Sequence, residues 1–271
     1  MLRKLQKKAI LLSKLFRIGA DSYSSFRLVF QLLLLSVGRY VGLVACPFSS
    51  RVHVADRKSR MYFVGTMGEL LTLIDIFADG SYAPYSHTDQ VGGMDTILDL
   101  GANIGIATVW FTLCYPNATI HAYEPNPHMF KFLKKNTAEF PRVRVFESAI
   151  AEKEGKVTFN QSIHFLESSI FEARDSVIIS VNAVTLDQAI ERIGGSVEYM
   201  KIDIEGSEFG AFASSERLQE VRAIVGEAHT EQSGHEQREL LQLLSSFNTV
   251  KMYNPNNDTV FGFFASRVTV Q

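Results

Sequence analysis

The sequence predicts a Rossmann-like α/β fold, a doubly wound and mostly parallel sheet of seven strands with a helical N-terminal extension. Three observations predict it. An apolar β-prone run over 97–100 ends in a glycine turn and continues into an apolar helix. Further β-prone runs, over 119–123, 143–146, 199–204 and 223–226, alternate with helical segments. A terminal hairpin, 249–253 with 260–265, adds an antiparallel C-terminal strand.

The 271 residues divide into three predicted parts. Residues 1–50 form a basic, helical extension, 51–95 form a segment that precedes the core, and 96–271 form the α/β domain. The middle part contains a predicted hairpin and then a helix that ends at Asp79-Gly80. Cys46 and Cys114 are far apart in sequence, which argues for a reducing compartment such as the cytoplasm and against a disulfide framework.

The N-terminal extension is basic. Its first forty residues contain eight Lys or Arg and one acid, Asp21. Apolar residues recur at helical spacing from Leu2 to Phe16 with lysines between them, a pattern typical of an amphipathic helix on a membrane surface. Leu28–Val37 is apolar, but a glutamine inside it and Arg39 at its end make it a poor transmembrane span. A helical cap on the α/β domain is the simpler interpretation, and peripheral membrane contact is the alternative.

The glycine turn indicates which ligand the sheet takes at its carboxyl edge. Asp99 stands two residues before Gly101, and Gly105 follows four residues later. A dinucleotide fingerprint needs glycine where Asn103 and Ile106 stand, and the Lys-Ser/Thr of a Walker loop is missing. The spacing instead resembles motif I of class I S-adenosylmethionine-dependent methyltransferases, in which the acid reaches toward the methionine end of the cofactor.

The second strand ends in Glu124. A carboxylate about 20 residues past the glycine turn is placed to accept both hydroxyls of an adenosine ribose. The turn over 148–150, after the third strand, sits where an adenine would be clamped. The predicted cofactor is S-adenosylmethionine, and the predicted cofactor-binding residues are Asp99, Gly101, Ala102, Asn103, Gly105, Glu124, Pro125, Asn126, Ser148 and Ala149.

Acidic residues cluster after the fourth core strand. Asp203, Glu205 and Glu208 surround one glycine turn, and such acids repel one another unless they are paired or metal-bound. Glu208 also suits the start of the next helix. The fifth strand leads to Glu227 and His229, which strand alternation puts on one face.

His229 is the best candidate for a general base, with an expected titration near pH 6–7. The predicted catalytic residues are Asp203, Glu205, Glu227 and His229. Carboxylate oxygens also suit a magnesium ion, although no residue is assigned as a metal ligand. Tyr82 and His87, just before the glycine turn, are candidates for the wall of a substrate pocket.

Together these motifs resemble the FkbM-type methyltransferase family. The resemblance spans about residues 69–265, and its motifs occur in the right order. It rests on 97–105, on Tyr123-Glu124-Pro125-Asn126 with Leu133 and Asn136, and on Ala149-Ile150, Ser168-Ser169, 184–187, 201–208 and Glu227. It implies an O-methyltransferase that acts on a hydroxyl of a glycan or natural-product acceptor.

Two other functions stay open. A dinucleotide-dependent oxidoreductase is disfavoured by the missing glycines, and a non-catalytic S-adenosylmethionine-binding module by the intact Asp99, Glu124 and Asp203. A nucleic acid is not an expected partner, because residues 41–271 carry 19 basic and 28 acidic residues, a net charge of −9. We expect a cytoplasmic protein, with peripheral contact to the membrane through its basic N-terminus as an additional hypothesis.

Overall fold

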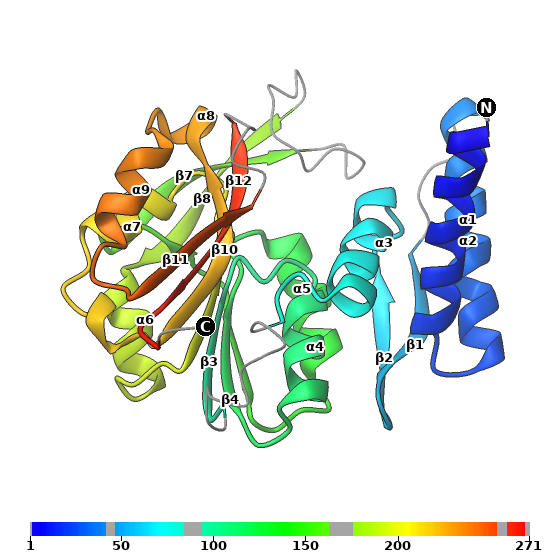
Figure 1. Cartoon of the computed structure of the whole chain (residues 1–271), viewed down its shortest axis with the longest axis horizontal. Helices are drawn as coiled ribbons and strands as arrows, with labels where there is room; N and C mark the ends of the chain where they lie inside the picture. Colours follow the sequence, from blue (N-terminus) through cyan, green and yellow to red (C-terminus); the bar gives the residue numbers. More distant parts are fainter. Residues whose placement is uncertain (1, 42–46, 84–93, 163–175, 254–258, 269–271) are drawn as a thin grey trace.

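The computed structural model describes residues 2–41, 47–83, 94–162, 176–253 and 259–268 (Figure 1). Its centre is a seven-stranded sheet of strand order β11-β12-β10-β9-β3-β4-β5. The strands are β3 (Thr96–Leu100), β4 (Thr119–Tyr123), β5 (Val143–Phe146), β9 (Tyr199–Ile202), β10 (Ala223–His229), β11 (Thr249–Tyr253) and β12 (Val260–Ser266). Among these described strands, β12 runs in the direction opposite to the other six. The predicted mostly parallel sheet with an antiparallel C-terminal strand is confirmed.

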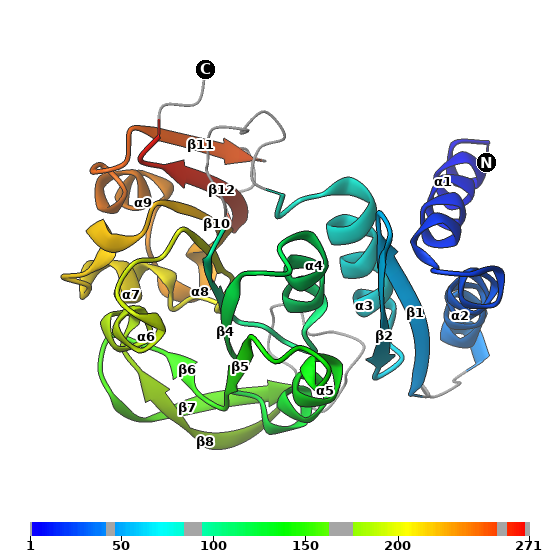
Figure 2. The ribbon, with the colours of Figure 1, turned by 90° about the horizontal axis from the view of Figure 1, so that it is seen from below.

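Helices cover both faces of this sheet (Figure 2). One face carries α4 (Ile106–Cys114) and α5 (Pro127–Thr137), and the other carries α6 (Leu186–Ile193), α7 (Glu208–Ala213) and α9 (Gln237–Leu243). Ile97 packs in the apolar cluster that includes α4, whereas Leu98 packs in the cluster that includes α6 and α7. Burial on both faces explains why β3 is a continuous apolar run instead of an alternating one.

A smaller sheet joins the core after β5. It contains β6 (Ala149–Ile150), β8 (Ser176–Val184) and β7 (Gly155–Ser162), with β8 in the middle. The turn predicted over 148–150 is therefore partly wrong, because Ala149 and Ile150 pair in parallel with Ala183 and Val184. Ile150 is buried, so its burial and the ladder hydrogen bonds favour a strand there.

The N-terminal part adds two layers. The first contains the hairpin β1 (Phe48–Val54) and β2 (Arg57–Phe63), followed by α3 (Met67–Ile74) and a π-helical turn, Asp75–Asp79. Thr66 and Glu69 form a capping box that starts α3, and Gly80 ends the segment in the left-handed conformation that glycine tolerates. The predicted hairpin and helix are confirmed.

The outermost layer is formed by α1 (Leu2–Ile18) and α2 (Ser22–Val41) (Figures 1 and 2). Leu15 and Leu28 are buried in the same apolar cluster as Phe63 of the hairpin and Leu70 of α3. The boundary expected at residue 50 thus falls inside β1, because the two helices and the hairpin share one core. None of the helices in the described ranges is long and apolar enough to cross a membrane.

Candidate active site at the carboxyl edge of the sheet

The glycine turn after β3 is held by close contacts with neighbouring elements. Gly101 has a φ of 80°, and a Cβ there would overlap the carbonyl oxygen of Asp203. Gly105 has a φ of 91°, and a Cβ there would come within 2.9 Å of Leu133 Cδ1. These contacts are with protein atoms of β9 and α5. The glycines therefore let the turn pack against the strand that leads into the acidic cluster.

Asp99 lies beneath the turn, fully buried. Its Oδ2 accepts a hydrogen bond from Thr108 Oγ1 at 2.6 Å, and its Oδ1 lies 3.4 Å from Lys201 Nζ. Lys201 Nζ also donates to the carbonyl of Gly101 at 2.6 Å. Burial alone would lower the pKa of Lys201, but Asp99 and Asp203 raise it, so the side chain is an ammonium ion. In this structure Asp99 faces Lys201, which fixes the turn from below, and sequence reasoning did not include Lys201 in the site.

Glu124 occupies the expected place at the tip of β4. Its two carboxylate oxygens accept hydrogen bonds from Asn103 N at 2.7 Å and Asn126 N at 2.8 Å. Burial raises the pKa of Glu124 to about 7, although these two bonds oppose that shift. Each oxygen has a further lone pair, so the carboxylate fits the two hydroxyls of a ribose. The residues present therefore suit the predicted cofactor.

The remaining cofactor candidates lie on the same edge. Ala102 N donates to the carbonyl of Tyr123 at 2.9 Å, which pins the turn to β4. Pro125 is the half-buried residue after Glu124, and the Asn126 side chain caps α5 by accepting from His128 N at 2.9 Å. Ser148 and Ala149 follow β5. Asp99 lies within β3, and the other nine candidates lie on the three segments that follow the neighbouring strands β3, β4 and β5.

The acidic cluster surrounds His229. This histidine ends β10 and is 2% exposed. Its Nδ1 lies 3.0 Å from Glu208 Oε1, and its Nε2 lies 3.5 Å from Glu205 Oε2 and 3.9 Å from Asp203 Oδ1. Burial alone would lower the pKa of His229, but the hydrogen bond and charge of Glu208, with the other two carboxylates, raise it to about 9. The expected titration near pH 6–7 is therefore wrong, and His229 carries a positive charge at neutral pH.

Glu208 holds this cluster in place. It starts α7, as predicted, yet it is fully buried and its carboxylate also accepts hydrogen bonds from Ile204 N and Gly206 N, both at 3.0 Å. One side chain thus fixes the loop after β9 and orients the His229 ring. The sequence analysis does not include Glu208 in the catalytic set, because a role at the start of a helix explains an acid at this position. Its position two residues after a glycine turn was the available signal.

Glu227 lies two residues before His229 on β10 and is half-buried. Burial and repulsion by Asp203 raise its pKa to about 7, while His229 and Lys201 act in the opposite direction. Tyr82 borders the same region, because burial and the charges of Asp203 and Glu227 raise its pKa well above the usual value. Its ring centroid is 5.7 Å from Lys201 Nζ, and Tyr199 Oη donates to its carbonyl. His87, the other pocket candidate, lies outside the described residues.

Three side chains of the cluster could share a cation. One ligand atom each from Asp203, Glu205 and His229 lies within 4.8 Å of the other two. In the described geometry Nε2 of His229 makes ion pairs with both carboxylates, so a divalent cation would have to replace those pairs.

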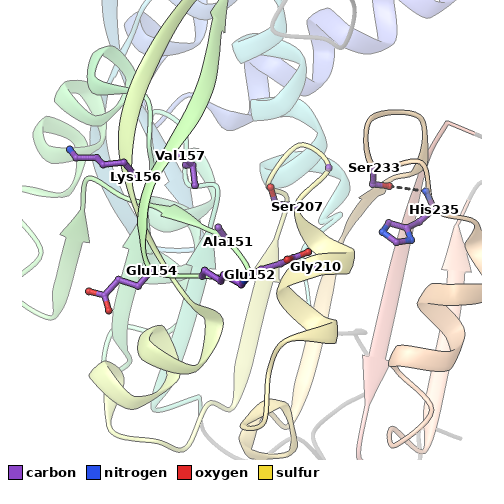
Figure 3. Close-up of a pocket in the computed structure, with 11 residues that line it drawn as sticks. Ala151, Glu152, Glu154, Lys156, Val157, Ser207, Gly210, Ser233 and His235 are labelled. Atoms are coloured by element: carbon purple, nitrogen blue, oxygen red, sulfur yellow. Dashed lines mark hydrogen bonds between the residues drawn. The ribbon is translucent and has the colours of Figure 1, made fainter.

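A polar cavity of about 460 Å³ adjoins the cluster (Figure 3). Its walls come from the segment after β6 with the start of β7, from the turn after β9 with α7, and from α8 (Thr230–Ser233) with His235. Its polar lining comes from Glu152, Lys153, Glu154, Lys156, Ser207, Ser233 and His235. Ser233 Oγ also donates to the carbonyl of His229 at 2.7 Å, which connects the cavity wall to the cluster. In Figure 3 Ser207 lies between Lys156 on one side and the Ser233–His235 segment on the other.

Comparison with known proteins identifies the family of this site. The model of the methyltransferase FkbM domain matches residues 99–251, from the buried acid of β3 to β11. The chain belongs to the FkbM methyltransferase family. It is therefore an S-adenosylmethionine-dependent methyltransferase, and neither the oxidoreductase nor the non-catalytic alternative is retained.

Curated relatives agree with this assignment. The chain is 27% identical to the 2-O-methyltransferase NoeI of Sinorhizobium fredii, over 65% of this chain and 85% of that protein. It is 24% identical to the hexuronic acid methyltransferase AglP of Haloferax volcanii, over 62% and 70% of the two chains. A shorter match, 35% identical, is to the 31-O-demethyl-FK506 methyltransferase FkbM of Streptomyces tacrolimicus and covers 31% and 33% of the two chains.

Proposed function

We propose that this FkbM-family enzyme transfers a methyl group from S-adenosylmethionine to a hydroxyl oxygen of a sugar or of a natural product. Two curated relatives support that acceptor class, since one is named a 2-O-methyltransferase and the other a hexuronic acid methyltransferase. The observation that carries the proposal is Glu227, a half-buried carboxylate with a raised pKa beside the acidic cluster. A hydroxyl acceptor needs such a group, because its proton has to leave when the oxygen is methylated.

Different residues of the chain bind the cofactor, hold the glycine turn and accept the proton. Glu124 and the backbone around Asn103 bind the ribose, and Lys201 holds the glycine turn in shape. S-adenosylmethionine, when bound, supplies an electrophilic methyl group on a sulfonium. Glu227 would take the proton that the acceptor hydroxyl loses when its oxygen is methylated. Orientation of the two reactants supplies much of the rate enhancement in such a methyl transfer.

His229 has a positioning role in this proposal. Its positive charge offsets the repulsion among Asp203, Glu205 and Glu208, so the loop after β9 stays against the glycine turn. A protonated imidazole cannot accept a further proton, which leaves Glu227 as the group with a pKa near neutrality on this side of the site.

We propose that a part of the acceptor away from the reacting hydroxyl binds in the cavity beside the cluster, because Glu227 is not among the residues that line it. Its lining offers hydroxyl, ammonium, carboxylate and imidazole groups, which suit the many hydroxyls of a sugar. Ser207→Ala would remove one such group without touching the cofactor residues. We expect a higher KM for the acceptor and an unchanged affinity for S-adenosylmethionine.

The direct test uses the full chain, methyl-labelled S-adenosylmethionine and a panel of free sugars and oligosaccharides. We expect one labelled methyl group as an ether, which resists mild alkali. A label released by mild alkali would indicate a methyl ester and would contradict the hydroxyl acceptor. Activity should survive EDTA, because His229 already balances the carboxylates; loss of activity that magnesium restores would assign a cation to Asp203, Glu205 and His229 instead.

A further inference from the structure

The outward face of α2 is an exposed apolar stripe. It consists of Tyr23, Phe26, Phe30, Leu33, Leu34 and Val37, which are between 38% and 74% exposed. Their spacing of three and four residues places them along one side of the helix. Phe16 of α1, also exposed, extends the stripe. Its ring packs edge-to-face on the ring of Phe26, with 5.8 Å between the ring centroids. Large contiguous apolar patches on a soluble protein mark interaction sites.

The stripe is held rigidly. Leu28 and Leu32, on the opposite side of α2, are buried in the core cluster that also contains Phe48 and Met61. Two hydrogen bonds from β1 secure the junction between the two helices. His53 Nε2 lies 2.8 Å from the carbonyl oxygen of Arg17, and Ser50 Oγ donates to the carbonyl of Ser24 at 3.1 Å. The apolar residues are therefore exposed because the fold presents them and not because the helix is loosely attached.

The charge around the stripe has one sign. Neither α1 nor α2 contains an acidic residue. Lys7, Lys8 and Arg17 of α1 are exposed, and Arg27 lies half-buried in α2. Asp21, the acid between the helices, is 3.7 Å from Arg51. Residues 41–271 have a net charge of −9, so it is the first forty residues that carry a net positive charge.

We propose that the α1–α2 face is a membrane-binding surface, with its aromatic stripe in the headgroup region of a bilayer that contains anionic lipids. Aromatic residues beside lysine and arginine match that environment, where an apolar interior borders negatively charged headgroups. The helices would lie along the surface. The proposal does not depend on the acceptor, and it places the enzyme at a membrane by contacts remote from the carboxyl-edge site.

The test is co-sedimentation of the full chain with vesicles. We expect binding to phosphatidylcholine vesicles that contain phosphatidylglycerol, and much weaker binding to phosphatidylcholine alone or at high salt. Point variants are needed, because a truncation would remove the buried Leu15 and Leu28 and open the core. Phe26→Ser combined with Phe30→Ser should lower the affinity at least about tenfold. Lys7→Glu combined with Lys8→Glu should lower it similarly and weaken its salt dependence.

Leu241→Ser is the matched control, since Leu241 is an exposed apolar residue of α9 at the other end of the molecule. It should bind vesicles like the wild type. All variants should keep wild-type S-adenosylmethionine binding and wild-type methylation of a soluble acceptor. A failure of the membrane proposal can therefore be told apart from a failure of the proposed reaction. Two results would overturn the proposal. One is no binding to phosphatidylglycerol vesicles; the other is a dimer in light scattering that the Phe26 and Phe30 changes convert to a monomer, which would make the stripe an interface between copies.

Discussion

At the scale of single residues, the neighbours of a side chain decide its chemical role more than its type does. Glu227 and His229 stand two residues apart on β10, and the pKa of each is raised. For Glu227, burial and Asp203 bring the pKa to about 7, so the carboxylate can gain and lose a proton near neutrality. For His229, three carboxylates bring it to about 9, so the imidazole stays charged. The groups that face Glu227 are Asp203, Lys201, His229, Asp75 and Tyr82.

The pH profile distinguishes the two candidate bases. A base acts in its deprotonated form, so kcat/KM should rise with pH and level off above about 7 if Glu227 accepts the proton. Glu227→Gln should lower turnover by about 10²–10⁴-fold and leave cofactor affinity nearly unchanged. The exposed Glu216→Gln is the control. A rise that continues to about pH 9, or full turnover in Glu227→Gln, would return the role to His229.

Glu124 gives a second prediction at this scale. Glu124→Gln keeps the size of the side chain but removes the charge that we propose accepts the ribose hydroxyls. We expect binding of S-adenosylmethionine to weaken by about 1–3 kcal/mol in calorimetry. Glu147→Gln, an exposed acid on the segment after β5, should bind the cofactor normally. Equal affinity of the two variants would mean that Glu124 only supports the backbone of Asn103 and Asn126.

The positions of the cofactor candidates on the sheet could be predicted because these residues follow fixed spacings along the chain, whereas their binding role stays a prediction. The position of Glu124 at the tip of the second strand can be found by counting residues from the glycine turn. Glu208 and Lys201 could not be assigned in the same way, since their roles depend on contacts between β9, β10 and the glycine turn. The pKa of His229 depends on the same contacts. Spacing therefore predicts which residues lie at this edge of the sheet, and packing determines which of their side chains are charged.

At the scale of elements, the order of strands and helices was predictable, whereas Ala149–Ile150 was not. The parallel core strands are apolar runs that end in glycines or acids, and the alternation with helices is plain in the sequence. β6 has two residues and exists because β8 lies beside it. A strand so short carries almost no local signal, and its partner is more than thirty residues away in the chain.

Asn136 makes a testable link between elements. This buried residue of α5 accepts from Tyr62 N at 2.7 Å and donates to the carbonyls of Tyr62 and Ile104, at 3.0 and 2.7 Å. It therefore ties the β1–β2 hairpin to the glycine turn. Asn136→Ala should lower the free energy of unfolding by about 2–4 kcal/mol in urea, because buried donors and acceptors lose their partners. The exposed Asn117→Ala should change it by less than about 0.5 kcal/mol, and an equally small change in Asn136→Ala would contradict the link.

At the scale of the whole molecule, charge is separated between two ends. The N-terminal helices are basic, and the carboxyl edge gathers six carboxylates: Asp99, Glu124, Asp203, Glu205, Glu208 and Glu227. Lys201 and His229 are the cations that contact this set in the described part of the chain. The repulsion among these carboxylates destabilises the folded protein, and its size depends on how many of the carboxylates and of the nearby cations are protonated. The stability of the cofactor-free protein should therefore depend on pH.

The sign of that dependence follows from His229. Its pKa is about 9 in the folded protein against 6.5 ordinarily, so the folded state binds the proton more tightly than the unfolded chain. The resulting stabilisation is fully present below about pH 6.5 and is lost as pH rises through about 9. The pKa values of Glu124 and Glu227 are also raised in the folded protein. Their contribution to the stability of the fold is therefore also lost as pH rises, between pH 4.5 and about 7. The free energy of unfolding, measured in urea, should therefore be lower at pH 9.5 than at pH 6.5. His229 should account for roughly 1–3 kcal/mol of the difference.

His229→Gln should remove that share of the pH dependence, and the exposed His235→Gln should keep it. If His229→Gln does not fold, Glu208→Gln provides the same test, because it removes the hydrogen-bonding carboxylate that lies 3.0 Å from Nδ1 and so lowers the pKa of the ring. A wild-type protein equally stable at both pH values would show that His229 is neutral in the fold. The cluster would then lack its central cation, and Glu205 and Asp203 would have to be held apart by solvent or by a bound ion.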